Sequence, residues 1–164
     1  MLEDIVIDTN VLAHMHNDQE ARQPESIAFA KAMILAETML CVDKGFDTDP
    51  AKNRSIIGAE YIEHLVFGSL GFALIARLAA AGRIVEYKKK PPQRESKKLD
   101  QSIRKQSDKA FLGVAVNSKN KICVSHDYRD FQAEKRVTLK NTIRVKIINA
   151  GECLSEYFDE PNAE

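Results

Sequence analysis

The sequence predicts an α/β fold with three layers, in which a central, mostly parallel sheet lies between two layers of helices. Short apolar runs rich in β-branched residues alternate with segments of helical periodicity, which is typical of βαβ units. The first run, Ile5-Val6-Ile7, has no polar interruption, as expected for a strand buried on both faces. Strands are predicted at residues 4–7, 39–42, 83–87, 122–125 and 143–148.

The segments between these strands fit helices and loops. Apolar residues at helical spacing predict a helix over residues 26–37, which Pro24 suits as an entry, an apolar helical region over 55–81 and a helix over 106–117. The turn-forming run GFDTDPAKN at 45–53 predicts an exposed loop. We expect a single domain over residues 1–157, followed by an acidic tail at 158–164.

Composition indicates an ordinary globular protein. The chain has 164 residues, of which 44% are hydrophobic and 29% charged, enough for one domain with a full core. No run approaches the roughly 20 apolar residues of a membrane-spanning helix, and the start MLEDIVID does not resemble a signal peptide. Cys41, Cys123 and Cys153 form no C-x-x-C pair, so neither a disulfide framework nor a thiolate zinc site is suggested. These features predict a cytoplasmic protein without membrane contact.

Acidic residues follow two of the predicted strands. Asp8 follows Ile7, and Asp127 comes shortly after Val124, so both are expected at the carboxyl edge of the sheet, where sites in open α/β folds gather. The two acids can meet if their strands are neighbours. Asp130 can share the site if the turn after Asp127 is helical. The competing interpretation of Asp8 and Asp130 is that each only caps a helix.

Two further acids are expected on helices that face the sheet. Asp108 shares a helix face with Phe111, Leu112 and Ala115, which must pack inward, although an acid in the first turn also suits the helix dipole. Glu60 shares a face with Ile56 and Ile57, whereas Glu63 does not, so we favour Glu60 for the site. Asp43 ends a predicted strand and is kept as an outer acid.

Three or four carboxylates in one cleft repel one another unless cations neutralise them. Because no paired His or Cys ligands accompany the acids, hard divalent ions with oxygen ligands are favoured, which means Mg²⁺ or Mn²⁺. Such ions activate water and stabilise the charge of a phosphoryl transition state, so the predicted chemistry is phosphodiester hydrolysis. Catalytic residues are expected at Asp8, Glu60, Asp108 and Asp127, and metal ligands at Asp8, Asp108, Asp127 and Asp130.

Positive charge is concentrated in one part of a chain whose net charge is zero. Residues 83–109 hold ten basic and four acidic residues, and a Lys-rich, Pro-containing insert spans 87–105 within them. Such a segment can hold a phosphate backbone, and it can equally be a solvated, flexible loop. The RNA-binding residues predicted here are Lys88, Lys89, Lys90, Arg94, Lys97 and Lys98.

The ordered set IDTNVL at 7–12, Glu60, SDKAFLGVA at 107–115 and VSHDYRDF at 124–131 resembles the PIN domain family of metal-dependent nucleases. The resemblance implies a central parallel sheet, metal-binding carboxylates at Asp8, Asp108 and Asp127, and Glu60 at the remaining acidic position. Thr9, Asn10 and Ser125 match residues that shape such a site. It further implies an RNA substrate, with DNA as an alternative, frequent homodimers, and in many bacterial members a toxin role with a partner antitoxin. The long 41–55 connection and the 87–105 insert depart from the compact toxin pattern.

Two other functions compete with an endoribonuclease. A non-catalytic RNA-binding or partner-binding domain with the same fold would bind RNA without turnover. A phosphohydrolase of the haloacid dehalogenase type also begins with a strand that ends in Asp, but it needs a second acid two residues later, where this chain has Asn10.

Overall fold

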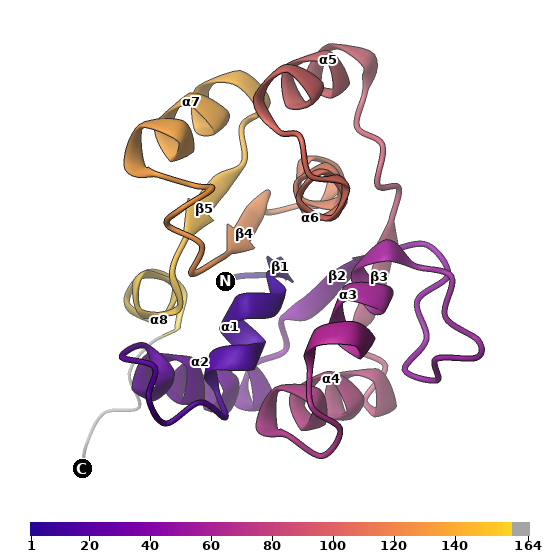
Figure 1. Cartoon of the computed structure of the whole chain (residues 1–164), viewed down its shortest axis with the longest axis vertical. Helices are drawn as coiled ribbons and strands as arrows, with labels where there is room; N and C mark the ends of the chain where they lie inside the picture. Colours follow the sequence, from indigo (N-terminus) through magenta and orange to yellow (C-terminus); the bar gives the residue numbers. More distant parts are fainter. Residues whose placement is uncertain (159–164) are drawn as a thin grey trace.

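The computed structural model describes residues 1–158, which form a five-stranded, all-parallel sheet with helices on both faces (Figure 1). The strands are β1 (Asp4–Ile7), β2 (Met39–Asp43), β3 (Ile84–Tyr87), β4 (Ile122–Val124) and β5 (Lys146–Ile148), in the order β3-β2-β1-β4-β5. This arrangement confirms the predicted α/β class. The chain runs from β1 outward to β2 and β3, then returns to β4 on the other side of β1 and runs outward to β5. The connections that follow β1 and β4 therefore go in opposite directions. Such a divergence opens a crevice at the carboxyl ends of the two strands.

The helices of the described residues form the two outer layers. Figure 1 shows α5, α6 and α7 on one side of the sheet and α1, α2 and α8 on the other. Their bounds are α1 Thr9–His14, α2 Gln23–Leu35, α3 Ile56–His64, α4 Leu70–Ala80, α5 Gln93–Ser102, α6 Gln106–Asn117, α7 Ala133–Ile143 and α8 Ala150–Tyr157.

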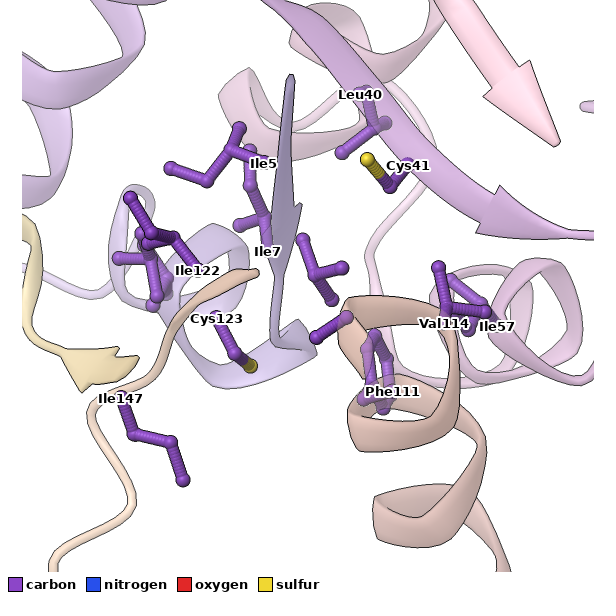
Figure 2. Close-up of a cluster of buried hydrophobic side chains, with 14 of the residues drawn as sticks. Ile5, Ile7, Leu40, Cys41, Ile57, Phe111, Val114, Ile122, Cys123 and Ile147 are labelled. Atoms are coloured by element: carbon purple, nitrogen blue, oxygen red, sulfur yellow. The ribbon is translucent and has the colours of Figure 1, made fainter. Parts of the chain in front are cut away.

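The core covers both faces of the central strands, against α6 on one face and against α1 and α2 on the other. All residues of β1 and β4 are buried, which explains the uninterrupted apolar runs at residues 5–7 and 122–124. Figure 2 shows Ile5 and Ile7 on one side of β1 and Phe111 and Val114 of α6 on the other, with Val114 next to Ile57. Cys41, Cys123 and Cys153 are buried free thiols.

Three predicted elements differ clearly in their bounds. The helix predicted over 26–37 is α2, which begins at Gln23 and ends at Leu35, so that Pro24 lies in its first turn. The apolar region 55–81 is two helices, α3 and α4, because the chain leaves helical geometry at Leu65 and Ser69 begins a new helix by accepting a hydrogen bond from the Phe72 amide. The strand predicted over 143–148 begins only at Lys146. Ile143 instead ends α7, and Arg144 then adopts a left-handed conformation (φ 62°) that turns the chain into β5.

The basic insert is partly helical and is attached to the fold. Residues Gln93–Ser102 form α5, whose one buried side chain is Leu99. Before this helix, Asn117 of α6 donates its Nδ2 hydrogens to the carbonyls of Lys88 (2.7 Å) and Lys90 (3.1 Å). Gly113 allows this approach, since a Cβ there would lie 1.8 Å from the Lys89 carbonyl oxygen. Of the two interpretations of this segment, the solvated loop is therefore wrong for residues 88–90, which these contacts hold against α6, and for the helical residues of α5.

Within residues 1–158, no helix is long and apolar enough to cross a bilayer. Apart from Phe158, the predicted acidic tail lies outside the described residues.

Candidate active site

An acidic cleft of about 240 Å³ lies at the carboxyl edge of the sheet. Strands β1 and β4 are neighbours in parallel register, and the Asp8 amide donates to the Val124 carbonyl at 2.9 Å. The residues that follow the two strands are therefore brought together, as the sequence predicted. The cleft is lined by Asp8, Thr9, Asn10, Ala13, Glu60, His64, Lys105, Ser107, Asp108, Phe111 and Asp127.

Asp8 occupies the inner end of this cleft. Its side chain is only 8% exposed, and its Oδ2 accepts hydrogen bonds from Ser125 Oγ (2.8 Å) and Asn10 Nδ2 (3.2 Å). Burial raises the pKa of Asp8, and the hydrogen bond from Ser125 opposes this rise. Although Asp8 precedes α1, its side chain makes no capping hydrogen bond. The helix-cap interpretation of Asp8 is therefore wrong.

Asp127 is held at the mouth of the cleft by the turn that follows β4. Its amide donates to Ser125 Oγ at 3.1 Å, so Ser125 contacts both acids and fixes their separation. Asp127 Oδ1 accepts from the amides of Arg129 (3.0 Å) and Asp130 (2.8 Å), which leaves Oδ2 without a hydrogen bond from the described residues. Asp130 is exposed and outside the cleft lining, although its charge helps to raise the pKa of Asp108.

Asp108 approaches from the opposite side, on the first turn of α6. It is 8% exposed and makes no capping hydrogen bond, so the predicted inward orientation is confirmed. Burial and the neighbouring charge of Asp8 raise the pKa of Asp108 to about 6, while Lys105 lowers it. Two buried carboxylates with raised pKa values therefore share one cleft, where each ionised group disfavours the ionisation of the other.

Of the two glutamates considered on α3, Glu60 lines the cleft and Glu63, 71% exposed, does not. Glu60 Oε2 lies 3.5 Å from His64 Nε2, and the ligand atoms of Glu60, Glu63 and His64 lie within 4.8 Å of one another. Asp43, considered as an outer acid, is instead buried beneath α3, where it accepts from the amides of Ile56 (2.8 Å) and Ile57 (3.0 Å). It fixes the start of the helix that carries Glu60 and does not line the cleft.

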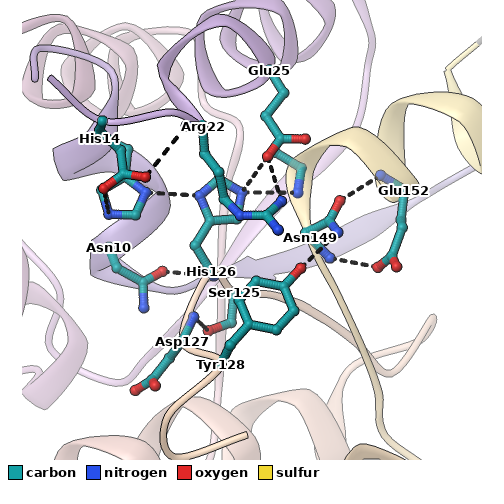
Figure 3. A network of polar contacts seen from close by, with 12 residues as sticks. Asn10, His14, Arg22, Glu25, Ser125, His126, Asp127, Tyr128, Asn149 and Glu152 are labelled. Atoms are coloured by element: carbon teal, nitrogen blue, oxygen red, sulfur yellow. Dashed lines mark hydrogen bonds and ion pairs between the residues drawn. The ribbon is translucent and has the colours of Figure 1, made fainter. Parts of the chain in front are cut away.

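Thr9 and Asn10 shape the cleft floor in different ways. Asn10 links the segments that follow the two strands. Its Oδ1 accepts from the His126 amide at 2.9 Å (Figure 3), and its Nδ2 donates to Asp8 Oδ2. Thr9 Oγ1 is buried and has no hydrogen-bond partner among the described residues. An unpaired buried hydroxyl beside carboxylates suits a bound water or hydrated cation. The carboxylates and the Thr9 hydroxyl offer oxygen atoms, which Mg²⁺ and Mn²⁺ prefer as ligands, and His64 adds one imidazole to the lining.

The predicted RNA-binding residues lie on two surfaces near the cleft. Lys88, Lys89 and Lys90 are exposed and, with Asp43 and Lys44, surround a separate cavity of about 260 Å³. Arg94, Lys97 and Lys98 are exposed on α5, which packs beside α6. Neither group enters the acidic cleft itself.

The sequence reasoning missed two features of the site. Lys105, three residues before Asp108, lines the cleft, and His126 is buried behind it in contact with His14 (Figure 3). Lys105 could have been found from the sequence, because it directly precedes the helix that bears Asp108. Nothing in the sequence pairs His14 with His126.

The fold and the cleft define an α/β protein with four carboxylates gathered at the carboxyl edge of a parallel sheet. No family model matches the chain, and comparisons with curated proteins and with solved structures find no match either. The functional argument therefore depends on the site.

Proposed function

We propose that this protein is a Mg²⁺- or Mn²⁺-dependent endoribonuclease. The observation that carries the proposal is the convergence of Asp8, Glu60, Asp108 and Asp127 from four separate elements on one cleft. The ionised carboxylates repel one another at these positions, and a divalent cation bound between them would remove this repulsion. The exposed lysines and arginines of residues 88–98 support a phosphate-backbone substrate.

In this proposal Asp8, Asp108 and Asp127 hold the cation, and Glu60 faces it across the cleft. When bound, the cation lowers the pKa of a water molecule and stabilises negative charge on the phosphate. In the hydrolysis, the water oxygen forms a new bond to phosphorus while the bond to the leaving ribose oxygen breaks, and the proton released by the water is balanced by the one that the leaving oxygen gains. Ser125 keeps Asp8 and Asp127 in position through its hydroxyl.

Cleavage of a circular RNA by the purified protein, with Mn²⁺ or with EDTA, tests the proposal. A circular substrate reports endonucleolytic cleavage because it has no ends. Asp8→Asn and Asp127→Asn are each expected to lower the cleavage rate at least about 100-fold without unfolding the protein. The matched pair on α3 is Glu60→Gln, expected to reduce cleavage, and Glu63→Gln, expected to leave it unchanged, because only Glu60 lines the cleft.

A non-catalytic RNA-binding domain is the competing function, supported by the same basic surfaces. It predicts that RNA binds with equal affinity in the presence and absence of Mn²⁺ and stays intact. Full cleavage by both Asp8→Asn and Asp127→Asn would overturn the nuclease proposal.

A further inference from the structure

One basic side chain, Lys105, stands among the acids of the cleft. It lies directly before α6, and its neighbours in the cleft lining include Asp8, Asp108 and Asp127. Lys109, Lys119 and Lys146 each pair with a carboxylate, whereas Lys105 forms no direct ion pair with any residue in the described part of the chain. Its ammonium group is therefore close enough to act on the acids without being bound to them.

The charge of Lys105 acts on the two most buried acids of the cleft. It lowers the pKa of both Asp8 and Asp108, against the effect of burial. A positive charge that favours ionised carboxylates also repels a divalent cation bound to them. A lysine that only assisted the metal site would be out of place here, since it weakens the binding of the ion.

The position of Lys105 suits an anionic ligand that binds in the cleft after the cation. A scissile phosphodiester carries a negative charge, and it must approach within reach of the cation and the water it activates. Lys105 is exposed on a flexible four-carbon stem, so its Nζ can donate to an oxygen that enters from solvent. Asp8 and Asp108, both 8% exposed, are too deep to make that first contact.

We propose that Lys105 is a catalytic residue that holds a non-bridging oxygen of the scissile phosphate, and that it does so at the expense of cation affinity. The inference depends on the proposed nuclease function and adds a residue to it. It separates Lys105 from the lysines of residues 88–98, which lie outside the cleft and would bind the flanking backbone.

The proposal predicts opposite changes in two measurements. Removal of the positive charge should tighten Mn²⁺ binding, by about threefold, because one repulsive charge is lost. The same change should slow cleavage at saturating Mn²⁺ and saturating RNA by about tenfold or more, because the phosphate loses a donor. A residue with a merely structural role would weaken both.

The experiment compares Lys105→Met, Lys105→Arg and the control Lys31→Met. Lys31 is exposed on α2, and its substitution removes the same charge away from the cleft. Mn²⁺ affinity is measured by electron paramagnetic resonance without RNA, and cleavage by single-turnover kinetics. We expect opposite shifts for Lys105→Met, partial recovery of cleavage for Lys105→Arg, and no change for Lys31→Met.

The outcomes distinguish this inference from the function on which it depends. If the wild-type protein cleaves RNA and Asp8→Asn does not, an unchanged single-turnover rate for Lys105→Met overturns the role of Lys105 alone. Weaker Mn²⁺ binding by Lys105→Met overturns it as well. If the wild-type protein neither binds Mn²⁺ nor cleaves RNA, the proposed function itself is overturned.

Discussion

His14 and His126 face each other through their Nδ1 atoms, which lie 2.9 Å apart. His126 Nε2 accepts a hydrogen bond from the Ala150 amide at 3.1 Å, so this nitrogen carries no proton. A neutral His126 must then be protonated at Nδ1 and donate to His14. One proton therefore lies between the two Nδ1 atoms. A second proton on His126 would have to bind Nε2, where it would break the hydrogen bond from the Ala150 amide.

This relationship predicts that acid destabilises the protein through His126. Burial and the nearby charge of His14 lower the pKa of His126 to about 3, whereas an unfolded chain keeps a value near 6.5. Because the folded-state pKa is the lower one, the stabilisation is complete above pH 6.5 and is lost as the pH falls toward 3. The free energy of unfolding should fall by up to about 1.4 kcal/mol per pH unit in that window.

Urea unfolding of the wild-type protein and of His126→Gln between pH 7.5 and pH 5 measures this contribution. Asp8 and Asp108, whose raised pKa values act in the opposite direction, are present in both proteins. Because burial also lowers the pKa of His14, the difference in slope reports the His14–His126 pair. The variant should be less stable at pH 7.5 and lose less stability on acidification. Equal slopes would contradict the proton arrangement.

A second prediction concerns the cost of keeping Asp108 ionised. Its pKa of about 6 lies above the ordinary value of 3.8, so the folded state binds the proton more tightly than the unfolded state. This carboxylate therefore destabilises the fold above pH 6, and the effect disappears as the pH falls through 6 toward 3.8. Asp108→Asn should raise the free energy of unfolding at pH 7.5 by about 1–3 kcal/mol without metal.

Thermal unfolding with and without Mn²⁺ tests whether the ionised Asp108 lowers stability in the free protein and raises it when the metal binds. The wild-type protein should gain stability on addition of Mn²⁺, and Asp108→Asn should gain little. Ser107→Ala is the neighbouring control, since it leaves the four acids in place. A variant that is destabilised at pH 7.5 would show that Asp108 has no repulsion to relieve.

The sequence predicted the parallel sheet and the acidic cleft because both depend on local patterns. The carboxyl end of β1 places Asp8 and the carboxyl end of β4 places Asp127, so recognition of the two strands sufficed to put both acids at one edge of the sheet. That β1 and β4 are neighbours, on which the meeting of the two acids depends, was a condition that only the structure met. The helix α5 was not predicted, because it has one buried residue, Leu99, and no apolar stripe from which a helix could be recognised. Its position depends on packing against α6 and α7, which a local pattern does not contain.

Gly113 gives a third prediction, which tests the attachment of the basic turn at residues 88–90. In Gly113→Ala the added methyl group would overlap the Lys89 carbonyl oxygen, so the turn must move away from α6. We expect a loss of about 1–3 kcal/mol in stability and weaker RNA binding. Asn117→Ala, which removes the two hydrogen bonds without overlap, should act in the same direction but more weakly. Amide chemical shifts of residues 88–90 that stay unchanged in Gly113→Ala would refute this account.

The last prediction concerns Arg136, which holds the turn that carries Asp127. Its Nε donates to the Phe131 carbonyl (2.7 Å), and its Nη2 donates to the carbonyls of Asp127 (3.2 Å) and Ser125 (3.4 Å). The guanidinium also stacks on the Tyr128 ring, 4.4 Å from its centroid. A lysine cannot reach these carbonyls with one planar group, so Arg136→Lys should release the turn.

We expect Arg136→Lys to weaken Mn²⁺ binding about tenfold at a temperature where the variant is still folded, because Asp127 loses its fixed position. Lys140→Met is the control on the same helix, since Lys140 is exposed and distant in sequence from the turn. Added guanidinium ion at millimolar concentration should partly restore Mn²⁺ affinity in an Arg136→Gly variant, an effect that a general loss of stability would not produce. Unchanged Mn²⁺ affinity in folded Arg136→Lys would mean that the Ser125 hydroxyl and the turn amides alone suffice to position Asp127.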